Sequence, residues 1–183
     1  KYNLELRTPH CSRTVNDSMP EVAFEYIKSS INKIGKEIHQ SRVAILGLAF
    51  KNNTGDIRFT PAKSLVEKLN ESGCSIKVFD PLVSLEKIRT ITDAEIGEDI
   101  FSTISGVDLI ACLAGHADFL NTPLNLLKEK TNDPCWIFDG RRCFDAKKVI
   151  DAGFLYTGIG FSHFSSSEKT IENIIDTIGS VDY

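Results

Sequence analysis

The sequence has 183 residues, which suffices for one full-sized domain but is short for two. Hydrophobic residues make up 42% and charged residues 25%, values close to the globular average, which exclude a disordered or collagen-like chain. The net charge of −4, from 21 basic and 25 acidic residues, excludes a broadly basic surface, so we expect no nucleic-acid partner.

The five cysteines indicate free thiols rather than a disulfide framework. Their number is odd, no two form a CxxC pair, and Cys74, Cys112 and Cys135 stand among apolar neighbours. Free thiols are typical of the reducing cytoplasm, which is the location we expect. The longest apolar run, 43–50, is far shorter than the about 20 residues needed to cross a bilayer, so we expect no membrane partner.

The first forty residues predict one long helix behind a short leading segment. Residues 1–17 show little periodicity, and we interpret them as the remnant of a preceding domain. A helix is predicted over 18–40, because Ser18 suits the cap, Pro20 suits the first turn, and apolar residues recur at helical spacing up to Ile38. Such a helix would either cover a sheet or mediate contact between subunits, and the sequence leaves both open.

From residue 42 onward, short apolar runs alternate with helical patterns. This alternation predicts an α/β fold, a Rossmann-like doubly wound parallel sheet with helices on both faces, preceded by the long connecting helix. The domain would span 41–161, with an ambiguous polar excursion over 82–98. Strands are predicted over 42–47, 76–79, 108–113, 136–139 and 154–158, and helices over 60–73, 100–104, 119–128 and 145–151.

The last segment, 162–183, is interpreted as a linker followed by an amphipathic helix. Residues 162–168 are rich in serine, and isoleucines then recur at helical spacing from Ile171 to Ile178. The helix would pack back on the domain or dock on a partner subunit.

Ligands of parallel sheets bind outside the carboxyl ends of the strands, so the loops there hold the candidate residues. The first loop, 47–61, has a single glycine after its strand and is not a GxGxxG motif, which makes a standard dinucleotide site on the next helix doubtful. It offers Lys51 and Arg58, which suit an anion attached to a sugar or base. The alternative is a solvated loop in which these cations pair with Asp56.

A second basic group follows the strand at 136–139. Arg141 and Arg142 come directly after Gly140, and a guanidinium there would bind phosphate in a bidentate fork. Two adjacent arginines are also common on an ordinary surface. Taken together, Lys51, Arg58 and Arg141 at one sheet edge of an acidic protein favour a focused phosphate site.

The remaining candidates indicate neither a nucleophile nor a metal centre. Cys112 lies within a core strand, and His116 and Asp118 are more typical of a surface turn than of a pocket. Asp80 precedes a proline and is most simply a turn residue. No cluster has the spacing of zinc ligands, so we expect no metal and no catalytic residue in this chain.

Several of these segments together resemble the C-terminal, UDP-sugar-binding domain of the UDP-glucose/GDP-mannose dehydrogenase family. The resemblance covers about residues 15–161 in order, and the first motif is the most specific. The segments that carry it are 15–16, 19–20, 47–62, 78–81, 138–142 and 158–160.

The resemblance implies part of an NAD-dependent UDP-sugar 6-dehydrogenase, which oxidises the C6 alcohol of a nucleotide sugar to the carboxylate. By resemblance, Phe50 and Lys51 would contact the UDP-sugar, and Arg141 would hold its uridine diphosphate. Arg58 would reach the NAD cofactor across a domain cleft. The helix at 18–40 would form much of a homodimer or higher homo-oligomer interface.

The family's GxGxxG domain and its GGxCxxKD cysteine motif do not occur in this sequence. We therefore expect the chain to bind the nucleotide half of the substrate and, alone, to be inactive. Gly115 and His116 stand where UDP-glucose enzymes usually carry Glu-Trp. This resembles the branch that oxidises UDP-N-acetylmannosamine, with UDP-glucose as the alternative substrate.

Two other classes of function compete with this interpretation. One is a stand-alone nucleotide-binding module without chemistry. The other is an interaction domain, whose amphipathic helices at 19–39 and 168–178 chiefly build an oligomer. Neither explains the grouping of Lys51, Arg58 and Arg141 as well.

Overall fold

The computed structural model describes residues 7–164, and the side chains of residues 12–161. The helix expected at 168–178 lies outside the described residues. The helices are α1 (Arg7–Lys33), the 3₁₀ turn η1 (Ile38–Gln40), α2 (Ala62–Glu71), α3 (Leu85–Arg89), α4 (Ile100–Ile104), α5 (Ala117–Leu120), α6 (Leu124–Lys128) and α7 (Ala146–Asp151). The strands are β1 (Arg42–Leu46), β2 (Ser75–Phe79), β3 (Glu95–Ile96), β4 (Leu109–Cys112), β5 (Trp136–Asp139), β6 (Leu155–Gly158) and β7 (Phe161–Phe164).

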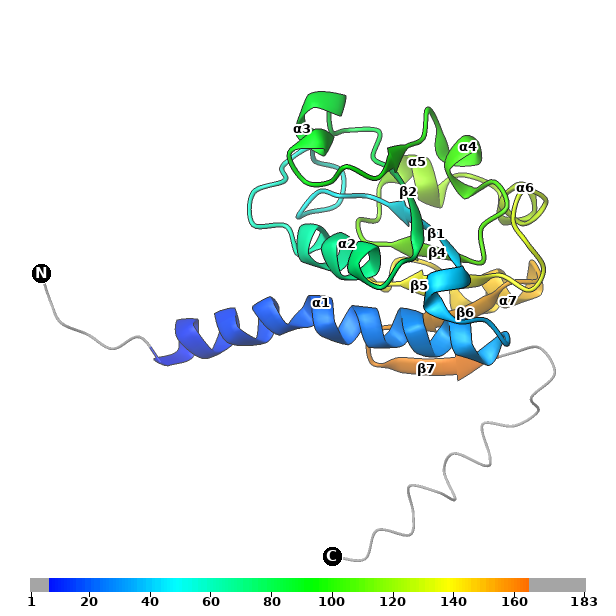
Figure 1. Cartoon of the computed structure of the whole chain (residues 1–183), viewed down its shortest axis with the longest axis horizontal. Helices are drawn as coiled ribbons and strands as arrows, with labels where there is room; N and C mark the ends of the chain where they lie inside the picture. The colour runs from blue at the N-terminus through cyan, green and yellow to red at the C-terminus, as the bar shows by residue number, and fades with distance from the viewer. Residues whose placement is uncertain (1–6, 165–183) are drawn as a thin grey trace, which may run out of the picture.

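The strands form one sheet in the order β3-β2-β1-β4-β5-β6-β7 (Figure 1). The first six are parallel, and β7 pairs antiparallel with β6. The order reverses between β1 and β4, which is the switch point where doubly wound folds place their ligands. The predicted Rossmann-like α/β fold is confirmed.

Two hydrophobic cores, one on each face of the sheet, hold the layers together. α1 and α2 cover one face, and α4, α5, α6 and α7 cover the other. Alternate residues of one strand supply both cores, because successive side chains of a strand point to opposite faces. In β1, for example, Val43 and Ile45 face α1 and α2, whereas Ala44 and Leu46 face the opposite layer.

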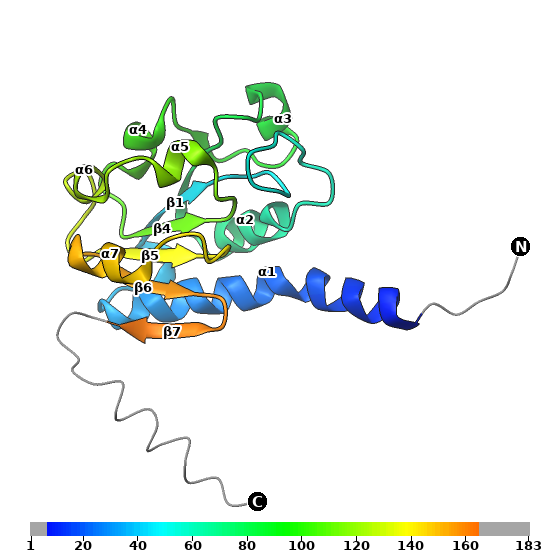
Figure 2. The same cartoon turned by 180° about the vertical axis from the view of Figure 1, so that it is seen from behind.

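The long helix α1 begins eleven residues earlier than predicted and ends at Lys33, so the expected bounds of 18–40 are wrong. Ser18 does not cap it, because its hydroxyl donates to the carbonyl of Val15 within the helix. Residues 12–18 are exposed, and the amino-terminal end of α1 extends past the rest of the domain (Figures 1 and 2). A helical stretch that buries no face shows no apolar periodicity, which is why the sequence pattern began too late.

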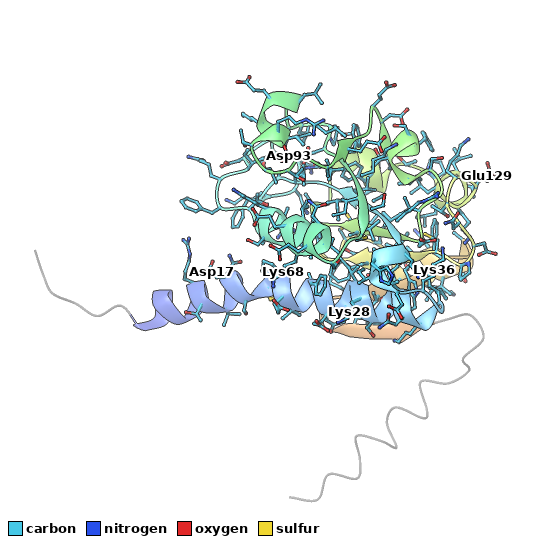
Figure 3. The ribbon with its side chains drawn as sticks, in the orientation of Figure 1. Asp17, Lys28, Lys36, Lys68, Asp93 and Glu129 are labelled. Atoms are coloured by element: carbon cyan, nitrogen blue, oxygen red, sulfur yellow. The ribbon has the colours of Figure 1, made fainter. Side chains whose placement is uncertain are left out.

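The second half of α1 covers the sheet. Ile27 and Ile31 are fully buried against it. Lys68 of α2 pairs with Glu21 of α1, and Figure 3 shows Lys68 between the two helices. The first of the two roles left open for this helix is therefore confirmed.

A buried carboxylate fixes the carboxyl end of α1 to the amino edge of the sheet. Asp108 accepts hydrogen bonds from the Lys36 ammonium at 2.6 Å, the Asn132 amide at 2.6 Å and the Arg42 backbone N–H at 3.0 Å. Burial alone would raise the pKa of Asp108, but these three donors together outweigh it and lower the pKa.

Two further expectations about local structure need correction, and the segment left ambiguous at 82–98 is now assigned. The predicted helix over 119–128 is two short helices, because Pro123 cannot continue the first. The segment 82–98 holds α3 and β3, which forms one edge of the sheet. Residues 161–164 form β7 rather than the start of a linker. No helix among residues 7–164 is long and apolar enough to span a membrane.

Candidate functional site

The loop after β1 crosses the carboxyl edge of the sheet against the loop after β4. Gly47 opens this loop with a φ of 85°, and a Cβ there would lie 2.6 Å from the Ala114 Cβ and 2.7 Å from its backbone nitrogen. Only glycine allows both this conformation and this approach. The single glycine of the first loop therefore serves loop packing at the switch point.

Asp80, at the end of β2, holds the start of the same loop. One carboxylate oxygen accepts from the backbone N–H groups of Leu48 at 2.7 Å and Ala49 at 3.1 Å. The other accepts from the N–H of Leu82 at 2.9 Å, which is the expected turn. Asp80 is therefore a turn residue that also anchors the candidate ligand-binding loop.

His116 is fully buried, so its interpretation as a surface residue is wrong. Its Nδ1 lies 2.9 Å from the backbone nitrogen of Asn53, and its Nε2 lies 3.2 Å from a carboxylate oxygen of Asp80. The side chains of Asn52 and Asn53 accept in return from the N–H groups of Gly115 and Ala117. A lone polar residue carries no periodic signal, and the pattern of the sequence did not reveal this contact between loops.

Arg141 joins the ends of β1, β4 and β5. Its Nε donates to the carbonyl of Leu113 at 2.7 Å, and its Nη2 donates to the carbonyl of Phe50 at 2.6 Å. These bonds use two of the five N–H groups of the guanidinium. Within the described residues its side chain makes no other hydrogen bond, so the remaining donors are available to an anion.

The backbone of Arg141 is fixed by Asp139, the last residue of β5. The fully buried carboxylate of Asp139 accepts from the Arg141 N–H at 3.1 Å, the Phe144 N–H at 2.8 Å and the Tyr156 hydroxyl at 3.0 Å. Burial, followed by the charge of Asp139, raises the pKa of Tyr156. Arg142 turns away and lies over the Phe161 ring at 4.7 Å.

A cavity of about 140 Å³ lies beside Arg141, between α1, the start of α2 and the ends of β4 and β5. The amino end of α2 favours negative charge, and Arg141 supplies donors for it. The apolar wall suits the flat or aliphatic part of a ligand. Besides Arg141, and Gly140 that was noted beside it, the cavity is lined by Asn16, Met19, Pro20, Ala23, Thr60, Pro61, Ala62, Leu65, Leu113, Phe138 and Ile159.

The structure brings together only some of the predicted site residues. Phe50 and Arg141 are joined by a hydrogen bond. Lys51 follows Phe50 with an exposed side chain that has no hydrogen bond or ion pair in the described part of the chain. Arg58 forms a bidentate pair with Asp56, at 2.9 and 2.7 Å, and this pairing lowers the pKa of Asp56. The alternative weighed for this loop therefore holds for Arg58.

The four cysteines whose side chains the structure describes do not form a reactive centre. Cys112 is fully buried with its Sγ 3.9 Å from that of Cys143, and this contact together with burial raises its pKa. A raised pKa disfavours the nucleophilic thiolate. Among the described residues, no group of three or more histidines, cysteines and carboxylates could hold a metal ion.

Comparison with known proteins places this geometry in a family. Residues 44–146, more than half of the chain, match the model of the UDP-glucose/GDP-mannose dehydrogenase family, UDP binding domain. The UDP-glucose 6-dehydrogenase of Drosophila melanogaster is 28% identical over 144 residues, covering 71% of this chain and 30% of that protein. The UDP-N-acetyl-D-mannosamine dehydrogenase of Methanococcus maripaludis strain C7 is 29% identical over 140 residues, covering 76% and 30%.

A solved structure agrees with these sequence relatives. The NDP-N-acetyl-D-galactosaminuronic acid dehydrogenase from Methanosarcina mazei Go1 superposes with a TM-score of 0.77 at 28% identity, covering 88% of this chain and 34% of that one. The chain spans about a third of the length of these relatives. Because the family model matches more than half of the chain, the chain belongs to the UDP-glucose/GDP-mannose dehydrogenase family, of which it carries the UDP binding domain.

Proposed function

We propose that this chain holds the nucleotide half of the substrate in an NAD-dependent UDP-sugar 6-dehydrogenase. The observation that carries the proposal is the position of Arg141 beside the cavity, where two backbone carbonyls hold its side chain. A guanidinium held in this way loses little conformational freedom when it binds a phosphate, so more of the interaction energy contributes to affinity. The diphosphate of UDP would bind Arg141 next to the amino end of α2.

Phe50 and Lys51 would contact the UDP-sugar from the other side of the site. The carbonyl of Phe50 accepts a hydrogen bond from Arg141, and this bond fixes the position of Phe50 relative to the guanidinium. Lys51 has an exposed ammonium that could approach a phosphate or a sugar hydroxyl as a point charge. The three residues therefore line one anion-binding edge in this proposal.

The described residues offer one candidate contact for NAD. Arg58 is 80% exposed in its side chain and keeps donors that Asp56 does not use. One exposed guanidinium fits a contact with an anionic group of a cofactor that is held mainly elsewhere. When bound, NAD would accept the hydride from the C6 carbon of the sugar.

We further propose that the 183-residue chain by itself does not oxidise UDP-sugars. The cysteine motif of the family is not in this sequence, and Cys112 has the buried environment of an inert thiol. Reduction of NAD by this chain with a UDP-sugar, measured at 340 nm, would overturn the proposal.

For the sugar, we propose UDP-N-acetylmannosamine over UDP-glucose. The support for this choice is the resemblance of Gly115 and His116 to the branch of the family that oxidises UDP-N-acetylmannosamine. The value of kcat/KM of an enzyme containing this domain, measured on both sugars, decides between them. A higher kcat/KM on UDP-glucose would contradict the assignment of UDP-N-acetylmannosamine as the substrate.

The same proposal includes a homodimer or larger homo-oligomer built on α1, and a cytoplasmic location. The exposed amino-terminal part of α1, with Val15 62% exposed, supports the first. The four described cysteines, which are free thiols, support the second. The same feature of α1 supports the interaction domain as a second candidate function. Association that depends on concentration, without affinity for nucleotides, would favour that candidate.

Chemical-shift mapping tests the location of the proposed site. UDP is titrated into ¹⁵N-labelled chain, with GDP and AMP as controls for base specificity. We expect saturable shifts at the amides of Phe50, Lys51, Gly140 and Arg141. Shifts confined to other elements would show that the nucleotide binds elsewhere.

A further inference from the structure

The segment from Ala49 to Asn53 is held in place by polar contacts, at its two ends and also at Phe50 and Asn52 between them. Lys51, Asn52 and Asn53 are exposed, so little burial of apolar surface fixes their position. At the front, Asp80 accepts from the Ala49 N–H at 3.1 Å. At the back, His116 lies 2.9 Å from the Asn53 nitrogen.

The contacts of His116 select one form of the imidazole ring. A backbone N–H can only donate, so the Nδ1 that faces Asn53 must be the unprotonated acceptor. The neutral ring then carries its proton on Nε2, which donates to the Asp80 carboxylate at 3.2 Å. Both side chains are fully buried, where the loss of either bond leaves a polar group unpaired.

The held segment also reaches the proposed anion site. It contains the Phe50 carbonyl, which accepts from Arg141, and the Lys51 ammonium. Asn53 extends the connection, because its own side chain accepts from the N–H of Ala117, the residue after His116. Asn53 is two residues from Lys51 and three from Phe50, so a loss of its contacts with the loop after β4 removes one of the supports of both residues.

We propose that His116 is a positioning residue for nucleotide binding, which acts only as the Nε2-protonated tautomer. It connects Asp80 to Asn53, and through the intervening backbone it places Lys51 and the Phe50 carbonyl that orients Arg141. This assignment rests on the proposed function of the 47–61 loop. His116 does not touch the nucleotide in this account.

Three substitutions separate positioning from mere packing. His116→Phe keeps an aromatic ring against Phe119, whose ring centroid lies 5.4 Å away, and removes both hydrogen bonds. His116→Asn places an amide oxygen near the former Nδ1 and can still accept from Asn53. His39→Asn is the matched control, because His39 is exposed at the opposite edge of the sheet.

The readouts are UDP affinity by calorimetry and the assigned amide spectrum of the 183-residue chain. We expect His116→Phe, which removes both hydrogen bonds and so loosens the segment that carries Phe50 and Lys51, to weaken UDP binding about tenfold or more. The same variant should shift the amides of Phe50 and Lys51 before any UDP is added. His116→Asn should recover most of the affinity, and His39→Asn should change nothing.

The ring nitrogens give a test that does not depend on UDP. Imidazole ¹⁵N spectra of the wild-type chain should show an unprotonated Nδ1 and a protonated Nε2 for His116. The inference is overturned if Nδ1 carries the proton, or if folded His116→Phe binds UDP as the wild type does. If His116→Phe fails to fold, His116→Asn and the ring spectrum decide. If the wild type does not bind UDP, the proposed function and the role in nucleotide binding both fail, and the amide and ring spectra then show only whether His116 positions the loop.

Discussion

The replacement Asp139→Asn tests whether the arginine loop depends on a buried carboxylate. Asp139 is fully buried and accepts from the Phe144 N–H at 2.8 Å, the Tyr156 hydroxyl at 3.0 Å and the Arg141 N–H at 3.1 Å. Asparagine has the same shape but offers one acceptor oxygen, and its NH₂ group cannot accept from a backbone N–H. The Tyr156 hydroxyl can reverse its role, so one backbone N–H loses its partner.

The size of the effect follows from this count. A hydrogen bond to a charged group contributes about 1.5–3 kcal/mol, and a buried donor left unpaired costs about 1–3 kcal/mol. Because these estimates overlap for the same lost contact, we expect the free energy of unfolding of Asp139→Asn to fall by about 2–4 kcal/mol. Such a loss is a large fraction of the stability of a typical domain.

Urea unfolding followed by the fluorescence of Trp136, the single tryptophan, measures this loss. Trp136 is buried at the start of β5, three residues before Asp139. Asp145→Asn is the control, because Asp145 caps α7 and asparagine caps a helix about as well as aspartate. A loss below about 1 kcal/mol for Asp139→Asn, or equal losses for both variants, would refute the reasoning.

Three further outcomes are expected. Gly47→Ala should lower the free energy of unfolding by about 2–4 kcal/mol, from left-handed strain and overlap with the next loop, and equal stability in urea would contradict it. Folding lowers the pKa of Asp108, so its ionised carboxylate stabilises the fold above its unfolded pKa, and this stabilisation is lost as the pH falls through the folded pKa. The difference in free energy of unfolding between the wild type and Asp108→Asn should therefore shrink as the pH is lowered. Iodoacetamide should modify half-buried Cys143 before Cys74 and Cys135, whose pKa burial raises to about 12, as peptide mapping would show.

The central strands of the sheet could be predicted because strands buried on both faces are short continuous runs of apolar residues. The buried runs at 42–47 and 136–139 became β1 and β5, and their ends placed Phe50 and Arg141 at one edge. The amino-terminal part of α1 shows no apolar pattern, since it buries no face. The strand β7 also escaped notice, because an edge strand four residues long needs little apolar sequence.

The residues proposed for the site could be chosen from the sequence, whereas the contacts that hold them could not. Arginines near strand ends are visible in a sequence, and in the structure Arg141 donates to the carbonyl of Phe50. The partners that hold the loop, His116 and Asp80, are 36 residues apart and meet only after the sheet forms. For Arg58 the difficulty was different. Its partner Asp56 is only two residues away, and the sequence suggested this pairing but could not decide between it and a ligand contact.

The central claim is that Arg141 binds the diphosphate of a UDP-sugar at the carboxyl edge of this domain. The most direct measurement is a calorimetric titration of UDP into the wild-type chain, Arg141→Ala and Arg89→Ala. Arg89 is the matched control, because it is an exposed arginine that also donates to a backbone carbonyl, that of Ala94, at 2.9 Å. We predict saturable binding that Arg141→Ala weakens by about 1.5–3 kcal/mol and Arg89→Ala leaves unchanged. Absence of UDP binding by the folded wild-type chain, or equal affinity in all three proteins, would contradict the claim.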